Sequence, residues 1–509
     1  MVGKRQIARA AGVVVVFFVL SRFLGLVREM AIGSRFGTSG ELDAYLAAFR
    51  LPDFIFQLIA GGALGSAFIP VFTAYLAEGD EEGAWRLASA VANLVLLALA
   101  ALAGLAAWLA PWLVPSVIAP GFGPEKQALT VELMRWMLLC PVIFGLSGLA
   151  MAVLNSYQHF LLPSLAPVVY NLSIIGGALF LVPFWGVYGL VAGVVAGAVL
   201  HLAVQAPGLL SRGLVYSLRL GLGDLRVREV GRLMLPRALG LSVVQINFLV
   251  NTILASGLVE GSLAALNFAW LLMLLPQGVF AQAVATAAFP TFAWLSAKGE
   301  EAEMRETFSA TLRTVLYLII PASVGLFTLR YPLIRLLFQR GAFDAESTGA
   351  VAWALSFYLP GLWAHAALEI ITRAFYARHD TLTPVLVGAG AMALNVILSL
   401  LLIGPLAHGG LAAANSSATI LETSILLFIL RKHLAGIGGE KLLPSLLRSA
   451  AAAGGMAVGL KIFLGWAGAG ALLPGAGGIA LGGAIYLAFS FLLGAEEPKA
   501  VWSLLAYHR

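Results

Sequence analysis

The sequence is short of charge, and this shortage excludes most classes of soluble protein. Only 11% of its 509 residues are Asp, Glu, Lys or Arg, while 60% are hydrophobic. Soluble domains carry about a quarter charged residues. Apolar runs of roughly 20 residues, the length that crosses a bilayer, recur along the whole chain. The composition therefore predicts an all-α polytopic membrane protein, and its short loops leave no room for a soluble catalytic domain.

Cysteine and histidine are also scarce. Cys140 is the one cysteine, so the sequence excludes a disulfide framework and a thiolate metal cluster. The seven histidines lack the helical two-His spacing of a metal site, and no glycine-rich phosphate loop follows a strand. We therefore predict no catalytic residue, no metal and no cofactor. A gradient of a monovalent cation (sodium or proton) or the membrane potential remains as the energy source.

The net charge of +6 does not point to nucleic acid, because the basic residues lie in short loops between the apolar runs. The N-terminus, the arginine-rich loop 211–232, the stretch "RKH" at 431–433 and the C-terminus all fall on one side of the membrane if about fourteen spans are present. The loops on the other side are poor in Lys and Arg. Because basic loops stay in the cytoplasm, both termini are predicted to be cytoplasmic.

An internal repeat organises these spans. At an offset of 220 residues, "AFIPVFTAYLAEGDEE" (67–82) aligns without a gap with "AAFPTFAWLSAKGEEA" (287–302), and the shared positions include a proline, a glycine and a glutamate. We predict two six-helix lobes related by a parallel repeat, residues 1–212 and 213–433, followed by two additional C-terminal spans in 434–509. Such halves hold a substrate between them near the midplane, so the architecture itself predicts a transporter that works by alternating access.

Charged residues interrupt the first two spans. An ionisable side chain inside a span is costly unless it faces a partner or water, so each is a functional candidate. In the first span, "SRFLGLVREM" (21–30) places Arg22 and Glu29 on nearly one face, and Arg28 and Arg35 on another. Because Arg28 and Glu29 are adjacent, we expect them to point in different directions and not to neutralise each other. The alternatives are that Arg28 and Arg35 snorkel to the far interface, and that Arg22 pairs with Asp43 or Asp53.

The second span contains Arg50, Pro52 and Asp53, followed by "AGG" at 60–62, where we expect close packing or a bend. A broken helix with inward charges is typical of the wall of a transporter cavity. Alternatively, Asp53 does not line a cavity and only forms an ion pair with an arginine of the first span. In the second half, His365, Glu369 and Arg373 form one stripe, as an internal salt bridge or as a cavity lining.

Several motifs, in order over most of the chain, resemble those of the lipid II flippases of the MurJ/MviN family within the MOP exporter superfamily. These motifs are "SRFLGLVRE" (21–29), "AFRLPD" (48–53), "AFIPVF" (67–72), "APGF" (119–122), "LNSYQHFLLPSLAPVVYNLSII" (154–175), "LFQRGAFDAEST" (337–348), "RAFYARHDTLTP" (373–384) and "LNVILS" (394–399). The resemblance implies a V-shaped pair of lobes in the bacterial cytoplasmic (inner) membrane, serving peptidoglycan synthesis.

The resemblance also implies a substrate and a site. The substrate is lipid II, an undecaprenyl-pyrophosphate-linked disaccharide pentapeptide, and the partners are membrane lipids and the cell-wall synthesis machinery. Arginines hold several phosphate oxygens at once, which suits a pyrophosphate. The implied substrate-binding residues are Arg22, Arg28, Glu29, Asp43, Arg50 and Asp53. Arg28→Ala is predicted to abolish rescue of a bacterium depleted of its own flippase, and Arg35→Ala to be tolerated.

The chain departs from the family in two places. Phe56, Gln57 and Gly61 stand where many relatives have two arginines and a glutamate, and Trp270 and Leu271 stand where they have an Asp-Arg pair. Arg22 and Arg28 are therefore expected to carry more of the headgroup binding than in relatives. The positions matching a sodium site of some relatives are the uncharged Asn251, Asn395 and Ser399.

Other functions remain as alternatives. The nearest are a flippase for another polyprenyl-linked oligosaccharide and a multidrug exporter of the same superfamily. A membrane-embedded glycosyltransferase or ligase is more remote, because such an enzyme needs acidic catalytic residues in a sizeable outer loop. The loops predicted outside hold only scattered charges such as Asp344 and Glu346. A passive scaffold for cell-wall enzymes is a further class.

Overall fold

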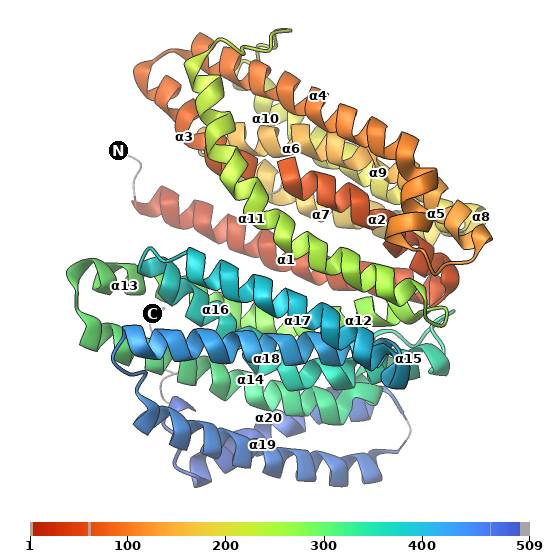
Figure 1. Cartoon of the computed structure of the whole chain (residues 1–509), viewed down its shortest axis with the longest axis vertical. Coiled ribbons are helices and arrows are strands. Elements are labelled where there is room, and N and C mark those ends of the chain that lie inside the picture. Colours follow the sequence, from red (N-terminus) through yellow and green to blue (C-terminus); the bar gives the residue numbers. More distant parts are fainter. Residues whose placement is uncertain (1–3, 60–62, 469, 499–509) are drawn as a thin grey trace. The chain divides into compact units, whose positions relative to one another are not determined.

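The computed structural model describes residues 4–59, 63–468 and 470–498, and every regular element in these ranges is a helix (Figure 1). Within these ranges, eleven helical segments are long and apolar enough to cross a membrane. The three remaining predicted spans coincide with α1 (Lys4–Phe36), with α2 (Gly40–Ile59) followed by α3 (Ala63–Glu78), and with α11 (Leu225–Ser256). The predicted all-α polytopic class is confirmed. Residues 60–62, where the sequence predicts a bend, lie outside the described residues.

The chain forms two compact units, Met1–Gly261 and Ser262–Arg509. Besides α1, α2, α3 and α11, the first unit contains α4 (Glu81–Leu113), η1 (Val114–Ile118), α5 (Pro124–Met137), α6 (Leu139–Ser156), α7 (Leu161–Gly176), η2 (Gly177–Leu181), α8 (Val182–Trp185), α9 (Val187–Ala203) and α10 (Ala206–Leu210). The second unit contains α12 (Ser262–Pro276), η3 (Gln277–Gln282), α13 (Ala283–Lys298), α14 (Glu301–Leu337), α15 (Ala345–Tyr358), η4 (Leu359–Gly361), α16 (Leu362–Ala377), α17 (Leu382–Leu406), α18 (His408–His433), α19 (Gly439–Ala467), η5 (Leu473–Gly477) and α20 (Gly478–Leu492).

The boundary between the compact units follows α11, whereas the predicted repeat begins a new half before it, at residue 213. α11 packs against α2 and α3 of the first unit, and Figure 1 shows it running beside them. Within the same unit α1 packs on α7, and α7 packs on α9. The predicted division into 1–212, 213–433 and 434–509 concerns the sequence repeat and stays a prediction.

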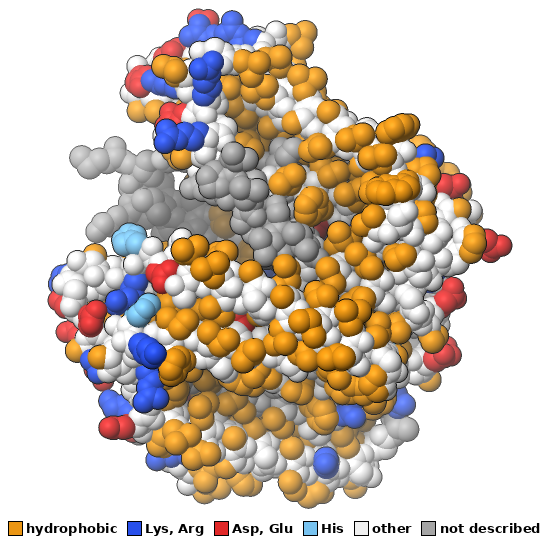
Figure 2. All heavy atoms as spheres, in the orientation of Figure 1, with side chains coloured by type: hydrophobic (Ala, Val, Ile, Leu, Met, Phe, Trp, Pro, Cys, Tyr) orange, Lys and Arg blue, Asp and Glu red, His pale blue; other side chains and the backbone are white. Residues whose placement is uncertain are grey.

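Large apolar side chains point outward from the helices. Trp108, Phe184 and Ile462 are 74%, 83% and 71% exposed. On the face shown in Figure 2, hydrophobic side chains cover the middle of the helices, and charged side chains gather near the helix ends. Apolar exposure on this scale marks a surface that meets something other than water, and here the long apolar helices identify lipid as what it meets.

The repeated motif has the same local structure in both units. α3 and α13 each contain the shared proline, Pro70 or Pro290, inside the helix. Each helix is followed by the shared glycine with a left-handed backbone, Gly79 at φ 77° and Gly299 at φ 73°. Glycine adopts this conformation without a steric penalty and so ends the helix. α4 and α14 then begin two residues later, so the aligned residues occupy equivalent turns.

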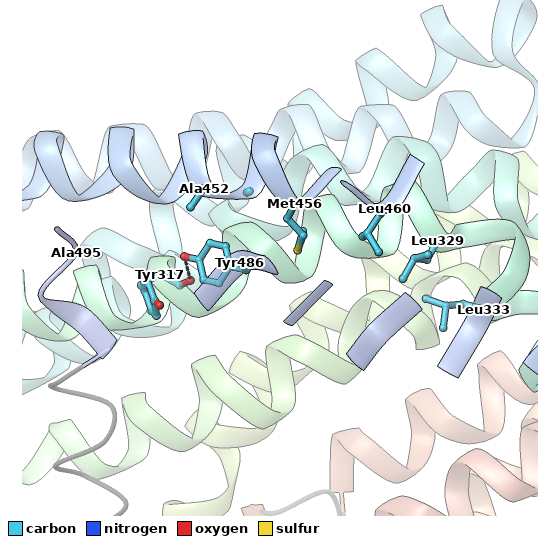
Figure 3. Close-up of a cluster of buried hydrophobic side chains, with 9 residues drawn as sticks. Tyr317, Leu329, Leu333, Ala452, Met456, Leu460, Tyr486 and Ala495 are labelled. Atoms are coloured by element: carbon cyan, nitrogen blue, oxygen red, sulfur yellow. Dashed lines mark hydrogen bonds between the residues drawn. The ribbon is translucent and has the colours of Figure 1, made fainter. Parts of the chain in front are cut away.

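The last two spans pack on α14 (Figure 3). Leu329 and Leu333 of α14 meet Met456 and Leu460 of α19 in one buried hydrophobic cluster. Tyr486 of α20 donates its hydroxyl hydrogen to the main-chain oxygen of Tyr317 at 2.7 Å. Methionine and leucine fill the space between the helices, and the tyrosine bond sets the register of α20. These helices are therefore an integral part of the second unit.

Candidate functional site

Arg28 and Glu29 of α1 form an ion pair. Nε and Nη2 of Arg28 donate to the same oxygen, Oε1 of Glu29, at 3.1 and 2.7 Å. The expectation that adjacent residues would not neutralise each other was wrong. Cβ directions on a helix differ by about 100° between neighbours, but an arginine side chain is long enough to fold back across that angle. Glu29 is 9% exposed, so Arg28 is its local source of charge compensation.

Asn171 of α7 is a second, uncharged partner of Arg28. Nη1 of Arg28 donates to Oδ1 of Asn171 at 3.1 Å. Nδ2 of Asn171 donates to the main-chain oxygen of Pro167 at 3.0 Å, and to both the main-chain oxygen and Oγ of Ser21 at 3.3 Å. Sequence reasoning did not single out this residue. The available signal was its place in "YNLSII" (170–175), an amide within an otherwise apolar span.

Arg22 lies on the open side of α1. Its guanidinium stands over the ring of Phe18, 5.3 Å from the centroid, and among the described residues it makes no ion pair. A side chain at Gly25, one turn on, would meet no atom within 4 Å. Arg22, Gly25 and Arg28 follow one another at three-residue spacing, so Gly25 neighbours each arginine, while the two arginines lie about 120° apart around α1. The first span therefore presents two arginines beside open space.

Arg50 and Asp53 of α2 lie one turn apart. Nε of Arg50 donates to Oγ1 of Thr252 on α11 at 2.9 Å, and its guanidinium stands 5.4 Å from the centroid of the Phe248 ring. Asp53 is within electrostatic range of Arg50 and is hydrogen-bonded by Gln57. Arg50 therefore links α2 to α11, and it lies one turn from the Asp53 carboxylate.

Tyr170 of α7 lies within electrostatic range of charged residues on α1 and α2. Arg28, Glu29 and Asp53 are all close enough to its hydroxyl to interact electrostatically. Its ring packs edge-on against Phe144, with centroids 5.1 Å apart. The structure thus joins the Arg28–Glu29 pair to α7 through Asn171, while Arg50 and Asp53 lie one turn apart on α2. These residues form the candidate site, entirely within the first unit.

Asp43 lies in a different environment. Its Oδ2 accepts from Nζ of Lys126 at 3.1 Å and from the backbone N–H of Gly261 at 2.8 Å, and the residue is 2% exposed. Nζ of Lys126 is also 3.7 Å from Glu260. Asp43 therefore joins the start of α2 to α5 and to the end of the first unit, and its carboxylate is already engaged.

The candidate ion-binding residues fall in both units. In the first unit, Nδ2 of Asn251 donates to Oδ1 of Asn247 at 3.3 Å, and its own Oδ1 is buried with no hydrogen-bond partner in the described part of the chain. In the second unit, Oγ of Ser399 lies 3.4 Å from Oδ1 of Asn395, and both residues are buried. The described residues contain no cluster of three His, Cys, Asp or Glu side chains that would hold a metal ion.

Three polar residues of α16, His365, Glu369 and Arg373, make two separate contacts. Nη1 of Arg373 lies 2.5 Å from Oε2 of Glu369, which confirms the internal salt bridge as one of the two readings. His365 instead meets Oδ1 of Asn415 on α18 at 3.1 Å, and its ring lies 5.6 Å from that of Trp270. Trp270 thus packs its ring against His365, which in turn contacts the side-chain amide of Asn415.

Comparison with known proteins identifies the family. The family profile described as lipid II flippase MurJ matches residues 32–472. The chain is 33% identical over 427 residues to the lipid II flippase MurJ of Burkholderia cenocepacia, covering 82% of each protein. It is 32% identical over 430 residues to the probable lipid II flippase MurJ of Haemophilus influenzae, covering 80% of this chain and 83% of the relative.

The fold has solved counterparts. A structure of the lipid II flippase MurJ in an inward closed conformation superposes with a TM-score of 0.80 and 26% identity, covering 94% of this chain and 98% of that one. An inward-facing multidrug resistance transporter of the MATE family, in the MOP superfamily, superposes with a TM-score of 0.69 at 16% identity, covering 83% of this chain and 98% of that one, and shares the fold alone. The chain is a multi-pass membrane transporter rather than an enzyme, and it belongs to the lipid II flippase MurJ family.

Proposed function

We propose that this chain flips lipid II from the inner to the outer leaflet of the bacterial cytoplasmic membrane by alternating access. Membership of the family, whose relatives in Burkholderia and Haemophilus carry the name of this activity, supports the substrate. A flippase forms no bond, so its site has to hold a charged headgroup inside the membrane and then release it unchanged. A pyrophosphate is the most highly charged part of lipid II, and cationic donors are what it needs.

The observation that carries this proposal is the placement of Arg22 and Arg28 on either side of Gly25 on α1. Of the five N–H donors of a guanidinium, three of Arg28 are used by Glu29 and Asn171, which leaves two for a ligand. Its side chain is 28% exposed, and the space beside Gly25 is open. Arg28, held by Glu29 and Asn171, and Arg22, which stacks on Phe18, can therefore both donate to one anionic group.

The other predicted residues take different parts in the proposal. Glu29 holds Arg28 in the absence of substrate and competes with the pyrophosphate for it. Arg50 and Asp53 extend the polar surface from α1 to α2 around Tyr170. Asp43 is occupied by Lys126 and Gly261, so we propose that it supports the site by holding the end of α2 and not by touching substrate.

We propose the membrane potential as the driving force. Asn251, Asn395 and Ser399 are all uncharged, and a site of neutral oxygens binds a monovalent cation more weakly than one with a carboxylate. Moving one elementary charge through 100 mV is worth about 2.3 kcal/mol, which is enough to bias the return of an arginine-bearing site. Sodium or proton dependence of transport would contradict this part of the proposal.

The predicted arrangement in the membrane accompanies this function. Two six-helix halves, 1–212 and 213–433, move about the substrate, and residues 434–509 add the two further spans. Both termini face the cytoplasm, where lipid II is made. The remaining partners are membrane lipids and the machinery that consumes lipid II at the outer surface.

Complementation tests the proposal. The chain is expressed in a bacterium depleted of its own lipid II flippase, and lipid II at the outer surface is measured together with growth. We expect rescue by the wild-type chain and none by Arg28→Ala at equal expression. If the well-expressed wild-type chain fails to rescue growth, the proposal is wrong. If the chain moves only other polyprenyl-linked oligosaccharides or drugs, one of the alternative functions is correct instead.

A further inference from the structure

Arg28 is held by two partners of unlike character. The carboxylate of Glu29 takes two of its N–H groups and cancels its charge. The amide of Asn171 takes one and leaves the charge intact. A pyrophosphate that approaches Arg28 competes with the carboxylate, because both are anions that seek the same donors. It need not compete with the amide, which holds the opposite side of the guanidinium.

The orientation of the Asn171 amide is fixed by its surroundings. Its Nδ2 faces three oxygens, those of Pro167 and Ser21, which accept hydrogen bonds. Only the NH₂ end of an amide donates, so Oδ1 has to point the other way, towards Arg28. The residue is 6% exposed, and it bonds to its own helix, to α1 and to the arginine. The acceptor for Arg28 is therefore already aligned before any ligand binds.

We propose that Asn171 is the positioning residue of the headgroup site: it keeps the Arg28 guanidinium in its binding orientation when the substrate pyrophosphate displaces Glu29. This inference rests on the proposed function. A neutral acceptor is required for this role, because a carboxylate there would cancel the charge that binds the substrate. The bond from Asn171 to Ser21 also fixes the turn of α1 that leads into Arg22, so one amide sets the place of both arginines.

The test measures lipid affinity in the full chain, reconstituted in nanodiscs. The probe is a polyprenyl pyrophosphate, with the corresponding polyprenyl monophosphate for comparison. We expect Asn171→Leu to weaken pyrophosphate binding by about tenfold, in the range of a lost hydrogen bond to a charged group. In an Arg28→Lys background, where the guanidinium is absent, the same substitution should change the affinity by less than about twofold.

A matched control separates positioning from simple stability. Asn93 of α4 is also 6% exposed and also bonds backbone oxygens, those of Ser217 and Arg219, but it lies outside the site. Asn93→Leu should lower the melting temperature and leave the affinity of the folded protein unchanged. Should Asn171→Leu fail to fold, Asn171→Ser keeps a hydroxyl that bonds the oxygen of Pro167 but is too short for Arg28, and it should show the same loss of affinity.

The outcomes are distinct. Equal weakening by the Asn171 substitutions in the wild-type and Arg28→Lys backgrounds would overturn the inference, since the residue would then act independently of Arg28. Unchanged affinity in Asn171→Leu or Asn171→Ser would overturn it as well. Failure of the wild-type chain to bind the pyrophosphate probe would instead count against the proposed function.

Discussion

Lys126 of α5 and Asp43 of α2 form a buried ion pair, with Nζ 3.1 Å from Oδ2 and only 13% and 3% of the two side chains exposed. The ammonium also stands 4.2 Å from the centroid of the Phe122 ring. Removing one member of a buried pair leaves the other charge without compensation, which costs far more than the pair itself contributes. The pair therefore stabilises the fold only while both partners are present.

Lys126→Met is expected to destabilise the protein by about 3–5 kcal/mol, because the Asp43 carboxylate stays buried without its cation. Thermal unfolding of the purified chain in detergent measures this. Lys298→Met is the control: its pair with Glu300 is 3.5 Å long and the lysine is 48% exposed. That change should be worth less than about 1 kcal/mol. If the two substitutions lowered the free energy of unfolding equally, burial of the ion pair would not determine the size of the loss.

Gly121, in the motif "APGF", is expected to tolerate no side chain. A Cβ at this position would lie 2.4 Å from Cα of Gly257 and 2.5 Å from its nitrogen, so backbone would have to move. The N–H of Gly121 also donates to Oγ of Ser256 at 3.0 Å. Gly121→Ala should therefore lower the melting temperature and the yield of folded protein. At Gly123 a Cβ meets nothing within 4 Å, and Gly123→Ala should behave as wild type.

Glu29→Gln is expected to tighten binding of a polyprenyl pyrophosphate by about three- to tenfold, because it removes the anion that competes for Arg28. The amide oxygen of Gln still accepts from Arg28, so the guanidinium stays in place. Binding to the chain in nanodiscs is measured at constant salt. Glu82→Gln, in an exposed i,i+4 pair with Arg86, is the matched neutralisation and should leave the affinity unchanged. Weaker binding in Glu29→Gln would mean that the carboxylate contributes to the bound state.

Arg35→Ala is expected to support transport, as the sequence predicts, but to lower stability. Nε and Nη2 of Arg35 donate to the main-chain oxygens of Ala178 and Leu179 at 3.1 and 2.9 Å. These carbonyls lie in η2, a π-helical turn. Hydrogen bonds from charged groups contribute about 1.5–3 kcal/mol each, and part of this is lost to water at an exposed site. Rescue of a depleted strain with a lowered melting temperature is the expected pair of results, and loss of rescue at normal expression would assign Arg35 to transport.

Arg35 shows where sequence reasoning stops. Its place near the end of the first span predicts snorkelling to the interface, and the exposure of Arg35 agrees with that position. Its partners could not be predicted, because a π-helical turn has no sequence signature of its own and lies 143 residues away. For the same reason, the sequence did not predict that Asn171 bonds to Arg28. Periodicity places residues on faces of one helix, whereas the acceptor of Arg28 comes from another helix.

The broad architecture could be predicted because its causes are local. Apolar length predicts the spans, and the proline, glycine and acidic residues of the repeat recur at equivalent turns of α3 and α13. The pairing of Arg28 with Glu29 could not be predicted from helical angles, since these give the direction of Cβ and not the reach of a long side chain. The sequence therefore predicted which residues are candidates for the site, whereas their hydrogen-bond and ion-pair partners were seen only in the structure.

Asp344 predicts a pH dependence at the start of α15. Its side chain accepts from the backbone N–H of Ser347 at 2.8 Å, and this bond holds the pKa of Asp344 below its ordinary value. A group with a lowered folded-state pKa contributes stability above its unfolded pKa of about 3.9 and loses it as pH falls through the folded value. Asp344→Asn keeps a capping oxygen that does not titrate. The stability difference between wild type and this variant should therefore be constant at neutral pH and shrink or reverse at acid pH, measured by melting temperature across the acid range. A difference that stays constant through that range would show that the cap does not depend on the charge of Asp344.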